Sequence, residues 1–255
     1  MESDKEKITL FANEFYLTAA EVNSQCEMPL SRLVTLIIDT ATAHANAIGA
    51  GYARMMEDNT SWVLSRLSID LDRMPSVNRT YCLYTWVDSL SRLFSDRLFE
   101  LRDVETGETI GWSHTTWMAI DMDTRKASDL TRITSLSDVI ISREFHGGKS
   151  GKLVPLRGEP DGVASWRFKV SDIDVNRHVT TRRYIDLITD IFPLEHYDNS
   201  GISRFEIAFK HEARYGQESL TRWQARPGEP GVYDIETSVD SVPCNISRIK
   251  FINRH

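Results

Sequence analysis

The sequence predicts an α+β protein made of two similar units, each an antiparallel sheet wrapped around a long central helix. The chain has 255 residues, a length that suits one large domain or two small ones. Apolar residues make up 41% and charged residues 26%, which is ordinary for a protein with a packed core. Both halves show the same order of elements: a strand, a helix and then a run of strands. A doubly wound parallel sheet needs strands and helices to alternate, so this order favours an antiparallel sheet.

The first half opens with a short strand at residues 14–17 and continues with a helix. Apolar residues recur at three- and four-residue spacing from Leu33 to Ile48, with Ser31 as the start signal and residues 49–51 as the stop signal. Runs rich in β-branched and aromatic residues then predict four strands, at residues 62–70, 80–87, 96–103 and 109–121.

The second half repeats this plan. A strand at residues 164–170 leads through a polar loop to a helix at residues 181–191, which Pro193 ends. Tyr184 and Ile188 belong to the apolar stripe of that helix. Four further strands are predicted at residues 203–212, 219–226, 233–239 and 245–253.

The repeated order predicts an internal duplication whose two sheets pair with each other. We expect an N-terminal domain at residues 1–134 and a C-terminal domain at residues 163–255. The linker between them, residues 135–162, has a glycine-rich centre at residues 147–151 and is expected to cross the surface.

Charge and cysteine content narrow the function classes. Residues 1–150 carry 15 Lys and Arg against 22 Asp and Glu, whereas residues 151–255 carry 15 of each. A nucleic-acid binder needs a basic excess, so that class is not expected. Residues 1–7 are charged where a signal peptide would be apolar, and the apolar stretch 33–53 is interrupted by polar residues, so we expect a cytoplasmic protein without a membrane span. Three widely spaced cysteines fit a reducing compartment and predict neither a metal site nor a cofactor.

Polar side chains gather in the loop before the second helix, at Asp172, Asp174, Asn176 and His178. Placing such groups near a buried helix start costs free energy unless they have hydrogen-bonding or charged partners, or serve in binding or catalysis. The backbone N–H groups of a helix start also favour a developing oxyanion. The alternative is that Asp172 or Asp174 only forms a turn and cap, with His178 exposed. The first half has no Asp-x-Asn-x-His loop.

The same loop resembles a family signature. Asp-Ile-Asp-Val-Asn-Arg-His-Val at residues 172–179, followed by Tyr184, is similar to the signature of hot-dog-fold thioesterases, above all the plant and bacterial acyl-acyl carrier protein thioesterases. Phe-Lys-His-Glu at residues 209–212 resembles the family's second catalytic motif. Further similar segments in the first half lie at residues 62–66, 72–75, 85–87 and 106–108, followed by Trp117.

Two departures from that family bear on mechanism. Thr180 and Thr181 stand where plant members usually have two asparagines, which removes amides that could position a substrate. Ala213 stands where a cysteine often follows the second-motif glutamate. A cysteine nucleophile is therefore excluded at this position.

The resemblance implies tandem hot-dog domains and four catalytic residues: Asp174, Asn176, His178 and Glu212. A thiolate with a pKa near 8.5 leaves readily, so the main tasks are to activate water and to stabilise an oxyanion. Glu212, expected on a strand beside the loop, is the candidate general base or direct nucleophile. His178 would orient the water, bind the carbonyl or share the proton, and Asn176 would donate to the carbonyl oxygen. Asp174 would fix the loop.

Candidate substrate-binding residues are less specific. Trp62 and Trp86 would line an acyl pocket supplied by the first half, or belong to the core. Arg182 and Arg183 would meet an acidic carrier protein, or be ordinary solvated charges. His44 lies on the apolar stripe of the first helix and is interpreted as a hydrogen-bonded core histidine.

The predicted function is hydrolysis of fatty acyl-acyl carrier protein to free fatty acid and the holo-carrier protein, in fatty acid biosynthesis. The expected partner is the carrier protein, with no nucleic acid and no membrane, and a homodimer is left open. Two alternatives remain: a hot-dog hydratase or dehydratase acting on acyl thioesters, and a non-catalytic acyl-thioester-binding module. Release of free thiol would separate the hydrolase from both.

Overall fold

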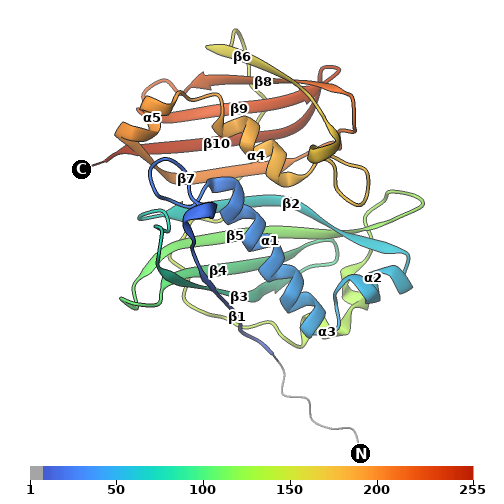
Figure 1. The fold of residues 1–255 in the computed structure, drawn as a ribbon. Coiled ribbons are helices and arrows are strands. Elements are labelled where there is room, and N and C mark those ends of the chain that lie inside the picture. The colour runs from blue at the N-terminus through green and yellow to red at the C-terminus, as the bar shows by residue number, and fades with distance from the viewer. Residues whose placement is uncertain (1–7, 255) are drawn as a thin grey trace, which may run out of the picture.

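The computed structural model describes residues 8–254, and in them ten strands form a single antiparallel sheet with two helices packed against one face (Figure 1). The charged segment at residues 1–7 lies outside the described residues. No helix in the described part of the chain is long and apolar enough to cross a membrane.

Both halves have the same element order. The first half contains β1 (Phe11–Tyr16), α1 (Leu30–Ala47), α2 (Tyr52–Glu57), β2 (Thr60–Leu71), β3 (Thr80–Leu90), β4 (Ser95–Asp103), β5 (Thr109–Asp121) and α3 (Thr134–Ser137). The second half contains β6 (Gly162–Arg167), α4 (Thr181–Thr189), α5 (Leu194–Asn199), β7 (Ser200–Phe209), β8 (Glu218–Ala225), β9 (Val232–Val239) and β10 (Val242–Asn253). Short 3₁₀ turns, η1 (Ala19–Glu21), η2 (Leu130–Arg132) and η3 (Val170–Asp172), complete the set.

The strand order confirms the predicted duplication and antiparallel fold. The sheet runs β1-β3-β4-β5-β2-β7-β10-β9-β8-β6, so each half has the same order when read outward from the centre. The halves join where β2 pairs with β7, with Leu67 opposite Ile207 and Ile69 opposite Phe205. Each half wraps its sheet around a helix, which is the tandem hot-dog architecture that the sequence predicted.

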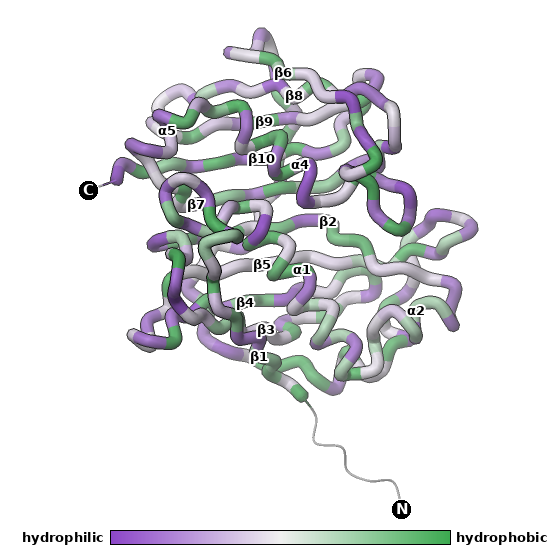
Figure 2. The backbone as a smooth tube through the Cα atoms, viewed as in Figure 1, coloured by the Kyte–Doolittle hydropathy of each residue, from purple (hydrophilic) through white to green (hydrophobic). Residues whose placement is uncertain are grey.

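One apolar core runs through both halves. Leu33 and Ile37 of α1 and Ile185 and Ile188 of α4 belong to the same buried cluster, together with Phe205 of β7. Side chains alternate between the two faces of a strand, so the strand residues next to a core residue such as Phe205 point away from the helices. Figure 2 shows hydrophobic and hydrophilic residues intermixed along the central strands, as this alternation requires.

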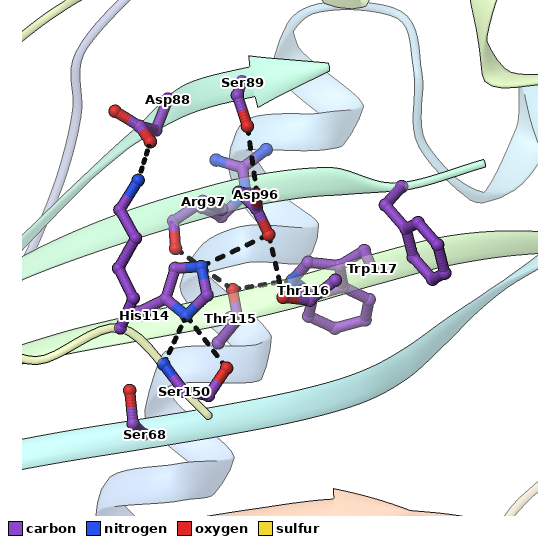
Figure 3. A network of polar contacts seen from close by, with 12 residues as sticks. Ser68, Asp88, Ser89, Asp96, Arg97, His114, Thr115, Thr116, Trp117 and Ser150 are labelled. Carbon is purple, nitrogen blue, oxygen red and sulfur yellow. Dashed lines mark hydrogen bonds and ion pairs between the residues drawn. The ribbon is translucent and has the colours of Figure 1, made fainter. Parts of the chain in front are cut away.

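The linker covers the opposite face of the sheet. Gly148 N donates to Asp70 over 2.7 Å, and Ser68 Oγ donates to Gly148 O over 2.8 Å. Figure 3 shows a third contact, in which His114 lies between Asp96 and Ser150. The Ser150 hydroxyl and backbone N–H lie 3.0 and 3.1 Å from His114 Nδ1, and His114 Nε2 lies 3.2 Å from Asp96.

Ser150, His114 and Asp96 have the composition of a catalytic Ser-His-Asp triad, but their geometry is that of a structural contact. Because the backbone N–H of Ser150 donates to Nδ1 of His114, that nitrogen is an acceptor and the proton of the neutral ring is on Nε2, facing Asp96. Ser150 thus contacts its histidine through both its hydroxyl and its own backbone. The arrangement ties the linker to the buried imidazole.

Several predicted boundaries were wrong, for local reasons. Ser31 does not start the first helix: α1 begins at Leu30 with Pro29 as its N-cap, and Ser31 is buried inside it. The second helix ends at Thr189, and Pro193 instead precedes α5. Glu212 is not on a strand, because β7 leaves the ladder after Phe209.

After two last hydrogen bonds to β10, the chain beyond β7 turns to the polar loop. Lys210 N and His211 N both donate to Cys244 O, which closes the end of the ladder. Val179 N then donates to Ala213 O over 2.8 Å, and His178 pairs with Arg214 in an isolated bridge. Glu212 is thereby placed beside the loop, in a segment that has left the sheet.

Candidate active site

Asp174 organises the backbone of the polar loop. Its N–H donates to His178 O over 2.8 Å, and its Oδ1 accepts from the backbone N–H groups of Asn176 (2.8 Å) and His178 (2.9 Å). Ile173 and Val179 close the loop in an antiparallel bridge. The carboxylate of Asp174 is therefore occupied by the loop itself, which leaves the side chains of Asn176 and His178 available.

Asp172 lies beneath the loop and is fully buried. Its carboxylate accepts from Trp166 Nε1 (2.9 Å) and Lys169 N (2.8 Å) and pairs with Arg183 Nε (2.6 Å). Burial opposes ionisation, but the hydrogen bonds from Lys169 and Trp166 and the charge of Arg183 outweigh it and lower the pKa of Asp172. Asp172 and Arg183 thus hold the loop onto the start of α4.

Glu212 is held between two basic side chains. His178 Nε2 lies 3.1 Å from Glu212 Oε2, and Arg125 Nη2 pairs with Glu212 Oε1. His178 is 18% exposed and Glu212 42% exposed, so the pair is accessible from solvent. Each oxygen of the Glu212 carboxylate therefore has a basic side chain as its partner.

The four candidate catalytic residues border one cavity of about 720 Å³. The first half contributes Arg125 and part of β2, including Trp62, and the second half contributes the polar loop, Tyr184 and Glu212. The site therefore depends on the β2–β7 pairing that joins the two halves.

A second cavity, of about 250 Å³, lies in the first half among α1, α2, β2, β4 and β5. Its walls are mostly apolar and include Ile38, Met55 and Trp117. Ser61 and Trp62 line both cavities, so the two spaces meet at β2. Trp62 is fixed there by a hydrogen bond from its Nε1 to Ala50 O (2.8 Å).

The other predicted binding residues lie elsewhere. Trp86 is fully buried on β3 with Arg143 of the linker 5.5 Å from its ring, whereas its neighbour Thr85 contacts Arg97 on the helix side. Trp86 therefore lies on the linker side of the sheet, as a core residue. Arg182 is exposed, with Asp186 at 3.9 Å, and the charge of Arg183 is already compensated by Asp172.

The first half contains a copy of the polar loop that the sequence comparison of the halves missed. Asn23 lies 151 residues before Asp174, and its Oδ1 accepts from the backbone N–H groups of Gln25 (3.0 Å) and Glu27 (2.9 Å). Asn23 N donates to Glu27 O over 2.8 Å, as Asp174 N does to His178 O. Arg32 pairs with Glu21 as Arg183 pairs with Asp172.

The copied loop has a different set of side chains. Glu27 occupies the place of His178, and it is paired with Arg254 over 2.6 Å. Met28 N donates to Pro75 O as Val179 N donates to Ala213 O, so Met74 occupies the place of Glu212. With an apolar side chain in place of the carboxylate, this loop lacks the candidate base. The alternation Asn-x-Gln-x-Glu at residues 23–27 was the available sequence signal.

Arg125 was also missed by sequence reasoning. It lies in the turn that follows β5, with a positive φ of 58°. Asp121 holds this turn through hydrogen bonds from the N–H (2.7 Å) and hydroxyl (2.8 Å) of Thr124. Arg125 is 87 residues from Glu212 in sequence, and no local pattern links them. Within residues 8–254, no cluster of three or more His, Cys, Asp or Glu side chains could hold a metal ion.

Comparisons with known proteins match this architecture. The family model described as "Acyl-ACP thioesterase N-terminal domain" matches residues 9–134, and the one described as "Acyl-ACP thioesterase C-terminal domain" matches residues 159–247. Similar curated proteins include oleoyl-acyl carrier protein thioesterase 1 of Arabidopsis thaliana, 24% identical over 80% of this chain and 60% of that protein. Palmitoyl-acyl carrier protein thioesterase of Gossypium hirsutum is 24% identical over 83% of this chain and 53% of that protein. The chain thus spans little more than half the length of these relatives.

Solved structures are similar over nearly the whole chain. The crystal structure of an acyl-ACP thioesterase from Bacteroides thetaiotaomicron is 31% identical, covers 96% of this chain and 98% of its own, and has a TM-score of 0.87. The 12:0-ACP thioesterase from Umbellularia californica is 18% identical, with coverage of 96% and 95% and a TM-score of 0.87. At 18% identity, the similarity to the Umbellularia californica structure supports the fold alone.

Proposed function

The chain belongs to the acyl-ACP thioesterase family, and on that basis we propose that it hydrolyses fatty acyl-ACP to free fatty acid and the thiol of the carrier protein. The observation that carries this proposal is the contact of Glu212 with both His178 and Arg125, in a cavity to which both halves contribute. The arrangement brings the carboxylate of Glu212, the imidazole of His178 and the amide of Asn176 to one solvent-accessible space.

In the proposed reaction Glu212 takes a proton from a water molecule whose oxygen attacks the thioester carbonyl carbon. The negative charge that develops on the carbonyl oxygen is stabilised by hydrogen-bond donors, for which Asn176 is the neutral candidate. When the carbon–sulfur bond breaks, the sulfur leaves as a thiolate and takes up a proton. His178 is placed beside Glu212 to orient the water and to share that proton. Direct attack by Glu212 remains the alternative for the first step.

The side chains of the first-half loop favour only one reaction centre among the described residues, the one in the second half. Its Asn23, Gln25 and Glu27 keep the backbone geometry of the catalytic loop, but Met74 cannot act as a base. The cavity among α1, α2 and the first-half strands meets the reaction cavity at Trp62 and is the proposed space for the acyl chain. In this proposal the second half carries the candidate catalytic residues and the first half holds most of the acyl chain.

The carrier protein would meet the enzyme at the mouth of the reaction cavity. Arg182 and Arg214 are exposed near the catalytic loop and give the balanced second half a local positive charge. Such charges raise the rate of encounter with an acidic partner, and salt screens them. We expect acyl-ACP to be preferred over the matching coenzyme A thioester at low salt. Equal kcat/KM values for the two at every salt concentration would remove this docking surface.

Thiol release with acyl-ACP of graded chain length tests the activity. A hydrolase releases the free carrier thiol and the fatty acid in equal amounts. A hydratase or dehydratase would change the acyl chain and leave the thioester intact, and a binding module would do neither. If the purified chain releases no thiol from any carrier-bound or coenzyme A-bound substrate, the proposed function is wrong.

A further inference from the structure

The cavity of the first half contains a buried positive charge. Arg97 of β4 is only 5% exposed and lines this cavity. Its Nη1 lies 2.6 Å from His44 Nδ1 and donates to Thr85 Oγ1 over 3.4 Å. In the described part of the chain, Arg97 forms no ion pair with a carboxylate.

His44 does not compensate that charge. Its Nε2 lies 2.8 Å from Ile8 O, an acceptor, so Nε2 carries the ring proton and Nδ1 is the lone pair that accepts from Arg97. Burial and the charge of Arg97 lower the pKa of His44 to about 4, which keeps the imidazole neutral. The guanidinium therefore keeps its full positive charge beside a neutral partner.

A buried arginine with no carboxylate partner is unusual. Buried charges in proteins are normally paired, because removing an ion from water costs several kcal/mol. A guanidinium has five N–H donors in a fixed fork, and the contacts to His44 and Thr85 use one nitrogen. The remaining nitrogens belong to a side chain that lines the cavity. An oxygen placed in the cavity would satisfy these donors.

Arg97 is a polar residue in a mostly apolar cavity, and it lies on β4, which β5 separates from the shared residues of β2. Ser95 lies two residues earlier on β4, so both side chains lie on the same face of the strand, and both line the cavity. Ile38 and Ala41 of α1, Met55 and Trp117 supply apolar walls. Figure 3 shows Arg97 next to Asp96, whose side chain instead joins the His114 network on the linker side. The linker's polar network therefore does not neutralise Arg97.

We propose that this cavity selects acyl chains that carry a hydrogen-bond-accepting oxygen at the end far from the thioester, with Arg97 as the donor. A terminal carboxylate would neutralise the buried charge, and a terminal hydroxyl or oxo group would accept one of its hydrogen bonds. The inference rests on the proposed hydrolase function, because this cavity shares Ser61 and Trp62 of β2 with the reaction cavity. Arg97 acts as a specificity-determining residue and takes no part in bond breaking.

The test compares acyl-ACP substrates of matched chain length that end in a methyl group, a hydroxyl or a carboxylate. The enzyme is expected to favour one of the oxygenated series by about tenfold or more in kcat/KM, since a hydrogen bond to a charged group contributes roughly that much. A preference for the carboxylate identifies charge neutralisation, and a preference for the hydroxyl identifies hydrogen bonding alone. Preference for the methyl series at every length overturns the inference and identifies Arg97 as a polar wall that limits chain length.

Variants show whether Arg97 is responsible. Arg97→Met removes the charge and keeps the length of the side chain, and should abolish the preference for the oxygenated chains. Arg97→Lys keeps a charge and should retain part of it. Arg132→Met, which changes an exposed arginine outside both cavities, is the matched control and should leave the preference unchanged. A preference that survives in folded Arg97→Met contradicts the assignment.

Binding of non-hydrolysable thioether analogues separates this inference from the proposed function. Calorimetry with the wild-type chain should give tighter binding of the oxygenated analogue than of the methyl analogue, even if no substrate is turned over. Turnover of plain chains without any preference for oxygen would leave the hydrolase proposal standing and remove only the role of Arg97. The wild-type comparison remains decisive if Arg97→Met does not fold.

Discussion

Arg125, in the turn that follows β5 of the first half, forms an ion pair with Glu212, which follows β7 of the second half. The contact crosses the junction between the two halves and leaves Glu212 Oε2 for His178 at 3.1 Å. Both partners of the ion pair are more than 40% exposed, at 44% and 42%, so it contributes little to stability. Its consequence is positional, because it fixes the orientation of the Glu212 carboxylate beside His178.

Replacing Arg125 should reduce turnover without unfolding the chain. We expect Arg125→Ala to lower kcat by about tenfold, because Glu212 loses one of its two basic partners and its fixed orientation. Arg125→Lys should recover part of kcat, since the positive charge remains. Steady-state kinetics, with thermal unfolding as the check on folding, measure both effects. Unchanged kcat in Arg125→Ala would show that the ion pair has no part in the reaction.

Asp174 should act through the loop backbone and not through proton transfer. The oxygen of an asparagine side chain can accept the two N–H groups that Asp174 Oδ1 now accepts. Asp174→Asn should therefore keep much more activity than Asp174→Ala, which loses both hydrogen bonds and the loop order. Activity that is equally low in both variants would assign Asp174 a direct chemical role. Hydrogen exchange of the loop amides provides the independent readout.

The copied loop of the first half offers a matched control for the catalytic one. Glu27→Gln changes the residue that occupies the place of His178, and its contact with Arg254 is a partly exposed ion pair. We expect kcat for acyl-ACP to stay within about twofold of wild type, because this loop has Met74 where a base would be needed. The same assay on His178→Ala should show a loss of about a hundredfold. A large loss in Glu27→Gln would mean that the first-half loop takes part in turnover.

His44 should make the stability of the chain depend on pH. Burial and the charge of Arg97 lower the pKa of His44 from the ordinary 6.5 to about 4. Between these two values the unfolded chain binds a proton that the folded chain does not, so stability falls as the pH falls. The loss should be complete below pH 4. Urea unfolding across this range should show a pH-dependent component in the wild type that is absent in His44→Gln; identical pH dependence in the two would contradict it.

Most of the fold was predictable because the long helices and the strands each have a local pattern of apolar and β-branched residues. β5 matches its predicted bounds, and the other strands, β1 to β4 and β6 to β10, differ by a few residues at their ends. The short helices α2, α3 and α5 were not predicted, because four to six residues give too little periodicity. The repeated element order predicted that the two sheets pair with each other, but it did not predict that β2 and β7 are the strands that join them.

The site was predictable only where its residues are close in sequence. Asp174, Asn176 and His178 share one loop, and the resemblance added Glu212, but the place of Glu212 outside the sheet depends on contacts of residues 210–213 with distant segments. Arg125 was not predictable because its partner is set by the junction of the halves. The domain bounds and a cytoplasmic location remain predictions from the sequence, which made no choice between a monomer and a homodimer.

Single-turnover hydrolysis of acyl-ACP by wild type and Glu212→Gln tests the central claim most directly. The variant keeps the size of the side chain and can still hydrogen-bond to His178, but it cannot accept a proton from water. We predict that acyl-ACP binding is retained and that the rate of thiol release falls by about a hundredfold or more. Thiol release at the wild-type rate by folded Glu212→Gln would contradict the account.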